Sequence, residues 1–213
     1  MSSDVLVTTP AQRQTEPHAE AVSRTRRQQA TFRKVLAAAM ATLREKSYAD
    51  LTVRLVAARA KVAPATAYTY FSSKNHLIAE VYLDLVRQVP CVTDVNVPMP
   101  IRVTSSLRHL ALVVADEPEI GAACTAALLD GGADPAVRAV RDRIGAEIHR
   151  RITSAIGPGA DPGTVFALEM AFFGALVQAG SGTFTYHEIA DRLGYVVGLI
   201  LAGANEPSTG GSE

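Results

Sequence analysis

The side chains with the most distinctive chemistry are concentrated in one basic stretch, from residue 24 to residue 89. This stretch contains 12 Lys or Arg and 4 Asp or Glu, a net charge of +8, whereas residues 90–213 contain 8 and 14, a net charge of −6. The formal net charge of the whole chain is +0, so the average conceals two oppositely charged parts. Because Lys and Arg neutralise phosphate groups, this sorting predicts a basic nucleic-acid-binding module joined to an acidic body.

The sequence offers no comparable set of residues for catalysis or for metal binding. The five histidines are scattered without metal-ligand spacing, at His18, His76, His109, His149 and His187. The sequence also lacks a P-loop, a nucleophile elbow and a Gly-rich dinucleotide fingerprint. We therefore expect no catalytic residue, no cofactor and no metal site, and a small all-α enzyme is a remote alternative.

Composition predicts a folded cytoplasmic protein. The chain is 48% apolar over 213 residues, which allows one or two domains with a proper core. Its start resembles no signal peptide, and no run approaches the roughly 18 apolar residues of a membrane span. Cys91 and Cys124 are too few for a disulfide scaffold; each could be a small buried hydrophobe or one half of a redox pair.

Hydrophobic spacing in the basic stretch predicts four helices that could position its charges. The first carries an apolar stripe from Phe32 to Leu43, with gaps of three and four residues. Thr52 is expected to cap a helix over 53–60, Pro64 to begin one over 64–71, and Ser73 to cap one over 74–89. Two short helices with a tight connection, at about 52–71, form a helix-turn-helix shape.

After a linker with three prolines, over residues 90–100, the pattern predicts five more helices. They are expected at about 101–115, 119–129, from Pro135 past Ile152, from Pro162 to about 179, and around 186–201. Asp134 and Asp161 are predicted caps, and Thr185 with Glu188 forms a predicted capping box. No segment has the period of a strand, so the fold class is all-α with about nine helices. Residues 1–23 and 204–213 are predicted to be disordered tails.

The stretch from Leu51-Thr52-Val53-Arg54 through Tyr68-Thr69-Tyr70-Phe71 to Ser73-Lys74 resembles the DNA-binding domain of TetR-family transcriptional regulators. The family pattern is Leu-Thr-Val-Arg, a Val-Ala pair, a Gly-Val turn, then Thr-Leu-Tyr-x-Tyr-Phe and Ser-Lys. The match covers roughly residues 25–87. Three positions depart from it: Lys61 replaces the turn glycine, Ala63 the capping serine, and Ala67 the leucine before the first tyrosine.

The resemblance implies a helix-turn-helix DNA-binding domain over residues 24–89 that binds double-stranded DNA. Its expected DNA-binding residues are Arg26, Arg27, Thr52, Arg54, Lys61, Pro64, Ala65, Thr66, Tyr68, Thr69, Tyr70 and Lys74. Arg54 could read guanine, while the basic side chains would contact phosphates. For Tyr68 and Phe71 the main role could instead be core packing, and for Tyr70 the two roles are evenly balanced.

The resemblance also implies that residues 90–203 form a ligand-binding and dimerisation domain. The segment after Asp161 is apolar on most faces, which favours a homodimer through the last two helices and a palindromic operator. Candidate contacts to a small, apolar effector are His109, Glu169, Met170, Phe173 and Gln178, with the 74–89 helix forming one wall. The expected function is a ligand-responsive regulator, most simply a repressor. The alternative is a helical dimer that has lost DNA binding and serves as a ligand sink or protein partner.

Overall fold

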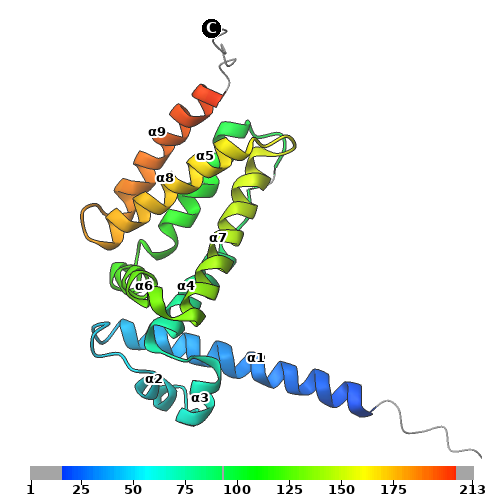
Figure 1. Cartoon of the computed structure of the whole chain (residues 1–213), viewed down its shortest axis with the longest axis vertical. Coiled ribbons are helices and arrows are strands. Elements are labelled where there is room, and N and C mark those ends of the chain that lie inside the picture. Colours follow the sequence, from blue (N-terminus) through cyan, green and yellow to red (C-terminus); the bar gives the residue numbers. More distant parts are fainter. Residues whose placement is uncertain (1–15, 93, 205–213) are drawn as a thin grey trace, which may run out of the picture.

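The computed structural model describes residues 16–92 and 94–204, and within them the fold is all-α, as predicted (Figure 1). These residues form nine α-helices and two short 3-10 helices, η1 and η2. Their bounds are α1 Glu16–Leu43, α2 Val53–Arg59, α3 Pro64–Tyr70, α4 Lys74–Gln88, α5 Met99–Ala111, η1 Leu112–Val114, α6 Pro118–Asp130, η2 Gly131–Ala133, α7 Pro135–Ile156, α8 Pro162–Gly180 and α9 Tyr186–Ala204. Figure 1 shows α1 to α3 at one end of the molecule and the later helices bundled beyond them.

Most helices begin where the capping residues predict, because each cap satisfies a backbone N–H that the helix itself cannot. The hydroxyl of Thr52 accepts from the Leu55 N–H at 3.1 Å, and that of Ser73 from the His76 N–H at 3.0 Å. Asp134 accepts from the Ala136 N–H at 2.9 Å. The capping box also forms: Glu188 accepts from the Thr185 N–H at 2.8 Å, and the Thr185 hydroxyl accepts in return at 3.1 Å.

The first helix begins earlier than expected. α1 starts at Glu16, so residues 16–23, which were predicted as part of a disordered tail, are helical; residues 1–15 lie outside the described residues. The segment is polar, but after Pro17 it contains no proline or glycine and consists largely of good helix formers. Once the apolar stripe further along has nucleated the helix, extension in the N-terminal direction costs little. At the other end α9 runs to Ala204, and residues 205–213 lie outside the description.

An aromatic cluster joins the helices of the N-terminal part. Phe71 is fully buried at the end of α3 and stacks on Phe32 of α1, with ring centroids 5.0 Å apart. Val56 and Ala57 of α2 are fully buried in the same hydrophobic core. The short α2 and α3 are therefore held by packing on each other and by the packing of α2 on α1, because seven residues alone could not remain helical in water.

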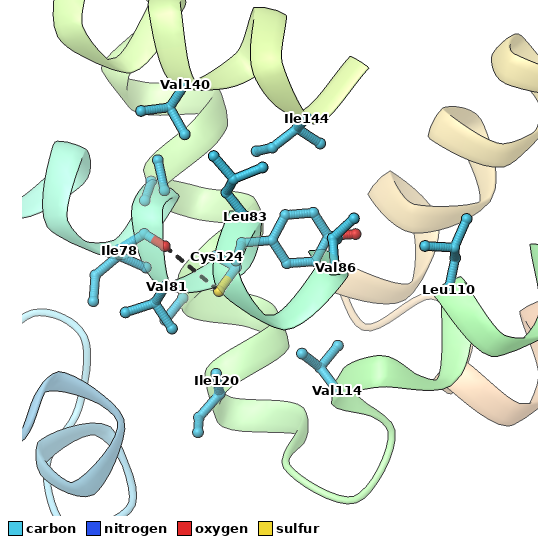
Figure 2. Packing of buried hydrophobic residues seen from close by; sticks show 14 of the residues in the cluster. Ile78, Val81, Leu83, Val86, Leu110, Val114, Ile120, Cys124, Val140 and Ile144 are labelled. Carbon is cyan, nitrogen blue, oxygen red and sulfur yellow. Dashed lines mark hydrogen bonds between the residues drawn. The ribbon is translucent and has the colours of Figure 1, made fainter. Parts of the chain in front are cut away.

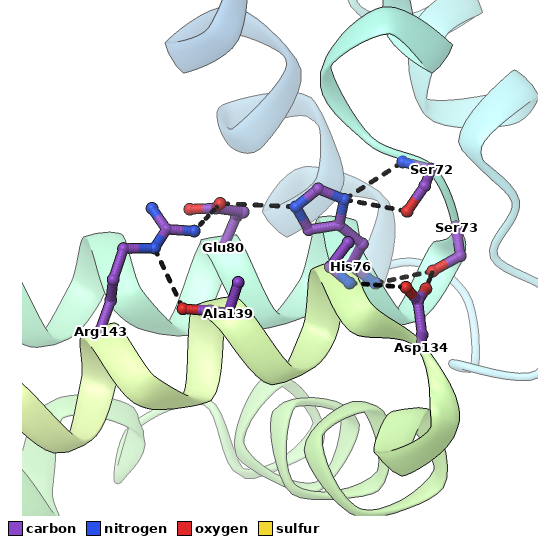
Figure 3. Close-up of polar contacts among 8 residues, drawn as sticks. Ser72, Ser73, His76, Glu80, Asp134, Ala139 and Arg143 are labelled. Atoms are coloured by element: carbon purple, nitrogen blue, oxygen red, sulfur yellow. Dashed lines mark hydrogen bonds and ion pairs between the residues drawn. The ribbon is translucent and has the colours of Figure 1, made fainter.

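Helix α4 connects the two parts of the molecule, since it packs on α1 as well as on α6 and α7. It runs parallel to α7, and polar contacts tie the two helices together at both ends. At their N-termini the Ser73 hydroxyl donates to the Asp134 carboxylate at 2.8 Å, so one N-cap bonds to the other (Figure 3). At the far end the Arg151 guanidinium of α7, which is buried, donates to the Val89 carbonyl at 2.7 Å.

Arg151 therefore does for the end of α4 what a capping residue does for its beginning. Its guanidinium also donates to the Pro90 carbonyl at 3.3 Å, and its Nε to Glu147 at 2.9 Å. Carbonyls at a helix C-terminus carry partial negative charge and lack partners within the helix, so a cation is favoured there. This arrangement fixes the position of α4 against α7.

Helix α8 has apolar residues on both its inner and its outer side. Val165, Leu168 and Phe172 are buried, whereas Phe166 and Met170 are exposed. Among the described residues, α8 is the one helix long and apolar enough to cross a membrane by length and composition. That is weak support for a membrane span, because α8 also packs on α6, α7 and α9 within the bundle.

Candidate nucleic-acid interface and effector cavity

The turn between α2 and α3 places Lys61 in an unusual backbone conformation. Its φ angle is 52°, the left-handed region, and Lys61 is the sole non-glycine residue with positive φ in the part of the chain that the structure describes. This is the position at which the sequence has Lys in place of the expected glycine. The turn forms nevertheless, with the Val62 N–H donating to the Ala57 carbonyl at 2.9 Å. The left-handed conformation costs a residue with a Cβ about 1–2 kcal/mol.

Helix α3 presents a continuous face of small and polar side chains to solvent. The exposed residues are Pro64, Ala65, Thr66, Tyr68 and Thr69, while Ala67 is fully buried and anchors the helix from beneath. Ala63 makes no side-chain capping bond, as its residue type predicts, and Pro64 begins the helix. The Thr69 hydroxyl donates to the Thr66 carbonyl at 2.5 Å, which leaves its methyl group and a lone pair for an external partner.

Two further predicted contact residues lie at the start of α2. Thr52 and Arg54 are exposed, and the Thr52 hydroxyl is already engaged as the cap of α2. Arg59, at the end of the same helix, is paired with Glu45 through two bonds of 2.5 and 2.6 Å. The structure thus leaves Arg54 exposed at the start of α2, while it holds Arg59 in an ion pair.

The tyrosines and Phe71 divide between surface and core. Tyr68 is 51% exposed, so its ring is available at the surface; the packing alternative does not hold for it. Phe71 is fully buried, in agreement with the packing alternative. Tyr70 is intermediate: its ring packs edge-on against Phe32 at 6.2 Å and remains half-buried.

The remaining basic residues of the predicted interface differ in whether contacts within the protein already hold their side chains. Arg26 and Arg27 are exposed on α1. Lys74 is half-buried, donates to the Tyr48 carbonyl at 3.1 Å and lies 4.3 Å from the centre of the Tyr48 ring. Its ammonium group therefore stabilises the loop before α2, and a phosphate at the start of α4 would have to share it.

A mainly apolar cavity lies in the body, between α4, η1, α6, α7, α8 and α9. Its volume is about 230 Å³. It is lined by Tyr82, Val114, Gly121, Cys124, Thr125, Leu128, Leu129, Arg141, Phe173, Leu176, Val177 and Tyr186. Leu129 and Val177 are exposed and form its open side, whereas Tyr82, Cys124 and Tyr186 are buried. Small concave sites with few polar groups are typical of small-molecule binding.

Apart from Arg141, the polar groups in the cavity wall are uncharged, and one of them has no partner among the described residues. The Cys124 thiol donates to the Ile78 carbonyl of α4 at 3.9 Å (Figure 2), and burial raises its pKa to about 12. Burial also raises the pKa of Tyr186, against the effect of its hydrogen bond with Thr125. The Tyr82 hydroxyl is buried and has no hydrogen-bond partner among the described residues. Such an unsatisfied group costs about 1–3 kcal/mol.

The structure disperses the five predicted effector contacts. Phe173 lines the cavity, but Met170 and Gln178 line a different groove, between α8 and α9. Glu169 is bonded to His149 at 2.8 Å, and His109 is exposed on α5. The sequence prediction selected large or polar residues of the body without knowing which faces converge. Tyr82 was missed as a contact, although the 74–89 helix was expected to form a wall and Tyr82 belongs to its apolar stripe.

The groove between α8 and α9 has a volume of about 840 Å³ and lies on the outside of the bundle. The exposed Met170 and Tyr195 line it, and further exposed apolar side chains lie on the same two helices, Phe166 on α8 and Leu199 on α9. Tyr195, at 72% exposed, is a large apolar ring with little contact to its own chain. Contiguous apolar surface of this kind marks an interaction site.

Comparisons with known proteins agree with this architecture. Residues 35–81 match the family model of bacterial regulatory proteins, tetR family. A TetR transcriptional regulator from Rhodococcus sp. RHA1 superposes with a TM-score of 0.69 at 21% identity, over 84% of this chain and 98% of that one. FadR from Bacillus subtilis, solved with stearoyl-CoA, gives 0.54 at 14% identity, over 81% and 98%.

A third similar structure is the multidrug binding protein EbrR complexed with imidazole, with a TM-score of 0.58 at 18% identity, over 83% of this chain and 91% of that one. At these identities the likeness to the solved structures is one of fold. The family match over residues 35–81 includes all of α2 and α3, and therefore the exposed face of α3. Residues 35–81 thus match the family of tetR-type bacterial regulatory proteins, and the all-helical chain shares the fold of the solved TetR-type structures.

Proposed function

We propose that the protein is a ligand-responsive, sequence-specific DNA-binding repressor that acts in the cytoplasm as a homodimer. The observation that supports DNA binding best is the exposed face of α3, which lies with the exposed Arg54 within the segment that matches the family. Arg54 would form a bidentate contact with guanine, and the small side chains of α3 would contact base edges and thymine methyl groups. Arg26, Arg27 and Lys61 are exposed cations suited to phosphates.

The exposed apolar face of α8 and α9 supports the homodimer. A second copy would cover Phe166, Tyr195 and Leu199 and place two α3 helices on one palindrome, about one helical turn apart. The variant Leu199→Glu should yield monomers in size-exclusion chromatography with light scattering. The matched control is Ile101→Glu, which changes an equally exposed residue of α5 and should leave the dimer intact.

Helix α4 offers a direct route from the cavity to the DNA-binding end. Its Tyr82 lines the cavity, and its N-cap Ser73 lies three residues after the last residue of α3. Figure 3 shows His76 between Ser72 and Glu80: the Ser72 N–H donates to its Nδ1 at 3.2 Å, and its Nε2 is 3.5 Å from Glu80, which Arg143 of α7 also contacts. A ligand that favours another position of α4 would change the spacing of the two α3 helices.

Solved ligand complexes of proteins with this fold support an effector role for the body, as in FadR with stearoyl-CoA and EbrR with imidazole. The coupling between effector and DNA requires that the effector bind the DNA-free conformation more tightly than the DNA-bound one.

The test of the proposed function is a gel shift on the DNA upstream of the protein's own coding sequence, over a series of salt concentrations. We expect a sequence-specific shift that weakens steeply with salt and is strongly reduced in Arg54→Ala and Tyr70→Ala while the dimer persists. Absence of a specific shift at low salt, with an intact dimer, contradicts the proposal and supports the alternative of a helical dimer without DNA binding.

A further inference from the structure

The Tyr82 hydroxyl is the feature of the cavity that its own fold leaves incomplete. Tyr82 is 5% exposed, and its hydroxyl has no hydrogen-bond partner among the described residues. A buried donor in a folded protein is almost always paired, so an unpaired one indicates a partner that is absent from the chain itself. Among the described residues, Thr153 of α7 also has a buried hydroxyl without a hydrogen-bond partner, but it does not line the cavity.

The neighbouring polar groups of the wall are already engaged. The Cys124 thiol donates to the Ile78 carbonyl, and the Tyr186 hydroxyl is hydrogen-bonded with Thr125. Both groups influence the Tyr82 hydroxyl electrostatically, so the three lie in one region of the wall. Tyr82 is consequently the hydroxyl of this region that can donate to a ligand without breaking an internal bond.

This region of the wall favours an uncharged ligand atom. Burial raises the pKa of Tyr82 and raises that of Cys124 to about 12, so both stay neutral at physiological pH. Arg141 is the one charged lining residue; it is partly buried, its Nη2 lies 3.6 Å from the position of a Cβ on Gly132, and it is not among the groups that act electrostatically on Tyr82. A ligand anion beside Tyr82 would be desolvated without a facing cation, which is costly.

The size of the cavity restricts the ligand further. Its volume of about 230 Å³ exceeds the roughly 150 Å³ of an apolar cavity that holds benzene, and it is below the roughly 300–1,000 Å³ of drug-sized pockets. Gly121 helps to set this shape, because a Cβ there would lie 2.3 Å from the Tyr186 hydroxyl. The space therefore suits one ring with a short substituent.

We propose that the cavity binds an uncharged, mainly apolar molecule of about one substituted ring, whose hydrogen-bond acceptor pairs with the Tyr82 hydroxyl. This inference rests on the proposed function, because it names the class of effector that the regulator senses. The hydrogen bond would join the ligand to α4 itself, the helix that follows α3 directly.

The test compares ketones with hydrocarbons of the same shape. The probes are acetophenone against α-methylstyrene and cyclohexanone against methylenecyclohexane, titrated without DNA by calorimetry or ligand-observed NMR. We expect each ketone to bind the native protein about 3- to 10-fold more tightly than its hydrocarbon, which is the net contribution of one hydrogen bond. In Tyr82→Phe this preference should disappear, while the stability of the unliganded protein stays equal or rises.

Two controls show where the probes bind. Tyr195→Phe removes the hydroxyl of an exposed tyrosine on α9 and should preserve the preference for ketones. Leu176→Phe adds bulk to the lining and should weaken all four probes. Lack of binding by both ketones up to about 1 mM, an undiminished preference in Tyr82→Phe, or unchanged binding in Leu176→Phe overturns the inference. Because these titrations need no DNA, their failure is distinct from a failure of the gel shift on upstream DNA, which tests the proposed function.

Discussion

The α2–α3 unit and the cavity of the body are built in opposite ways. The unit extends from Thr52 to Phe71, and its functional side chains point outwards from two seven-residue helices. The cavity collects residues from Tyr82 to Tyr186, and its side chains point inwards from five α-helices and η1. The surface that would read DNA is therefore local in sequence and polar, whereas the cavity is distributed and mainly apolar.

Helix α4 is the element that the two regions share. Its first turn closes the α2–α3 unit through the Ser73 cap, and its third turn contributes Tyr82 to the cavity. The bonds from Ser73 to Asp134 and from Val89 to Arg151 fix both of its ends on α7. The difference between the regions predicts that variants should separate into those that change DNA binding alone and those that change the stability of the body.

The largest expected effect is on the body. Arg151→Met should lower the free energy of unfolding by about 3 kcal/mol, because it leaves the carbonyls at the end of α4 buried without a donor and removes a charge partner of Glu147. Urea unfolding measures the loss. Arg138→Met, an exposed position of the same helix, is the control and should change little. Equal stability of the two variants would show that α4 does not need this anchor.

The second effect is confined to the DNA-binding surface. Arg54→Ala should weaken binding to the specific site by about 1–3 kcal/mol, with no loss of thermal stability, because Arg54 is exposed and its proposed base contact would exist only in the complex. Fluorescence anisotropy on specific and random DNA measures it. Arg59→Ala, on the same helix but held by Glu45, is the matched control. A similar loss of specificity in both variants would mean that bulk charge, and not Arg54, is responsible.

Lys61 combines a backbone effect with a charge effect, and two variants separate them. Lys61→Gly should raise the free energy of unfolding by up to about 1 kcal/mol, because glycine adopts a φ of 52° without strain. Lys61→Ala keeps the strain. If Lys61 contacts a phosphate, both variants should reduce the slope of the logarithm of DNA affinity against the logarithm of salt concentration by about one. Greater stability in Lys61→Ala than in Lys61→Gly would contradict the assignment of strain to this turn.

The smallest effect concerns pH and the contact between α4 and α7. Burial alone would raise the pKa of Glu80, but hydrogen bonds from His76 and Arg143 outweigh it and hold the pKa below its ordinary value. The stabilisation is therefore present above the unfolded-state pKa of about 4.3 and is lost as the pH falls through the lower pKa of the folded state.

Glu80→Gln tests this sign, because glutamine cannot titrate. The difference in unfolding free energy between the native protein and Glu80→Gln should shrink towards zero as the pH is lowered below about 4.3. Arg143→Met removes one of the compensating donors and should move the loss to higher pH. Acid titration followed by circular dichroism measures both variants. A difference that stays constant down to acid pH would show that Glu80 acts through packing and not through its charge.

The fold was largely predictable because helix starts depend on neighbours in the chain. Thr52, Ser73, Asp134 and the Thr185–Glu188 pair cap the helices that their residue types predicted, and the stripe of α7 from Val137 to Ile152 is buried throughout. The exposed placement of Arg54 and Thr66 also followed from local pattern and resemblance. The early start of α1 did not, because a polar segment shows no periodicity even when it continues a stable helix.

Three placements depended on contacts between residues far apart in the chain. Lys74 binds Tyr48 of the preceding loop, and Arg151 reaches the end of α4 across more than 60 positions. The cavity required five α-helices to converge, so Tyr82 and Tyr186 became its wall while His109 and Gln178 remained outside.

The sequence by itself determined the all-α class, most helix boundaries to within a few residues (the start of α1 excepted) and the basic helix-turn-helix segment, because caps, turns and periodicity act between near neighbours. Only the tertiary structure decided which faces of α4, α6, α8 and α9 enclose a space and which polar group in it lacks a partner. These features depend on how side chains from helices far apart in the sequence pack together. The apolar spacing along one helix shows which face is buried but does not specify which helix packs against that face.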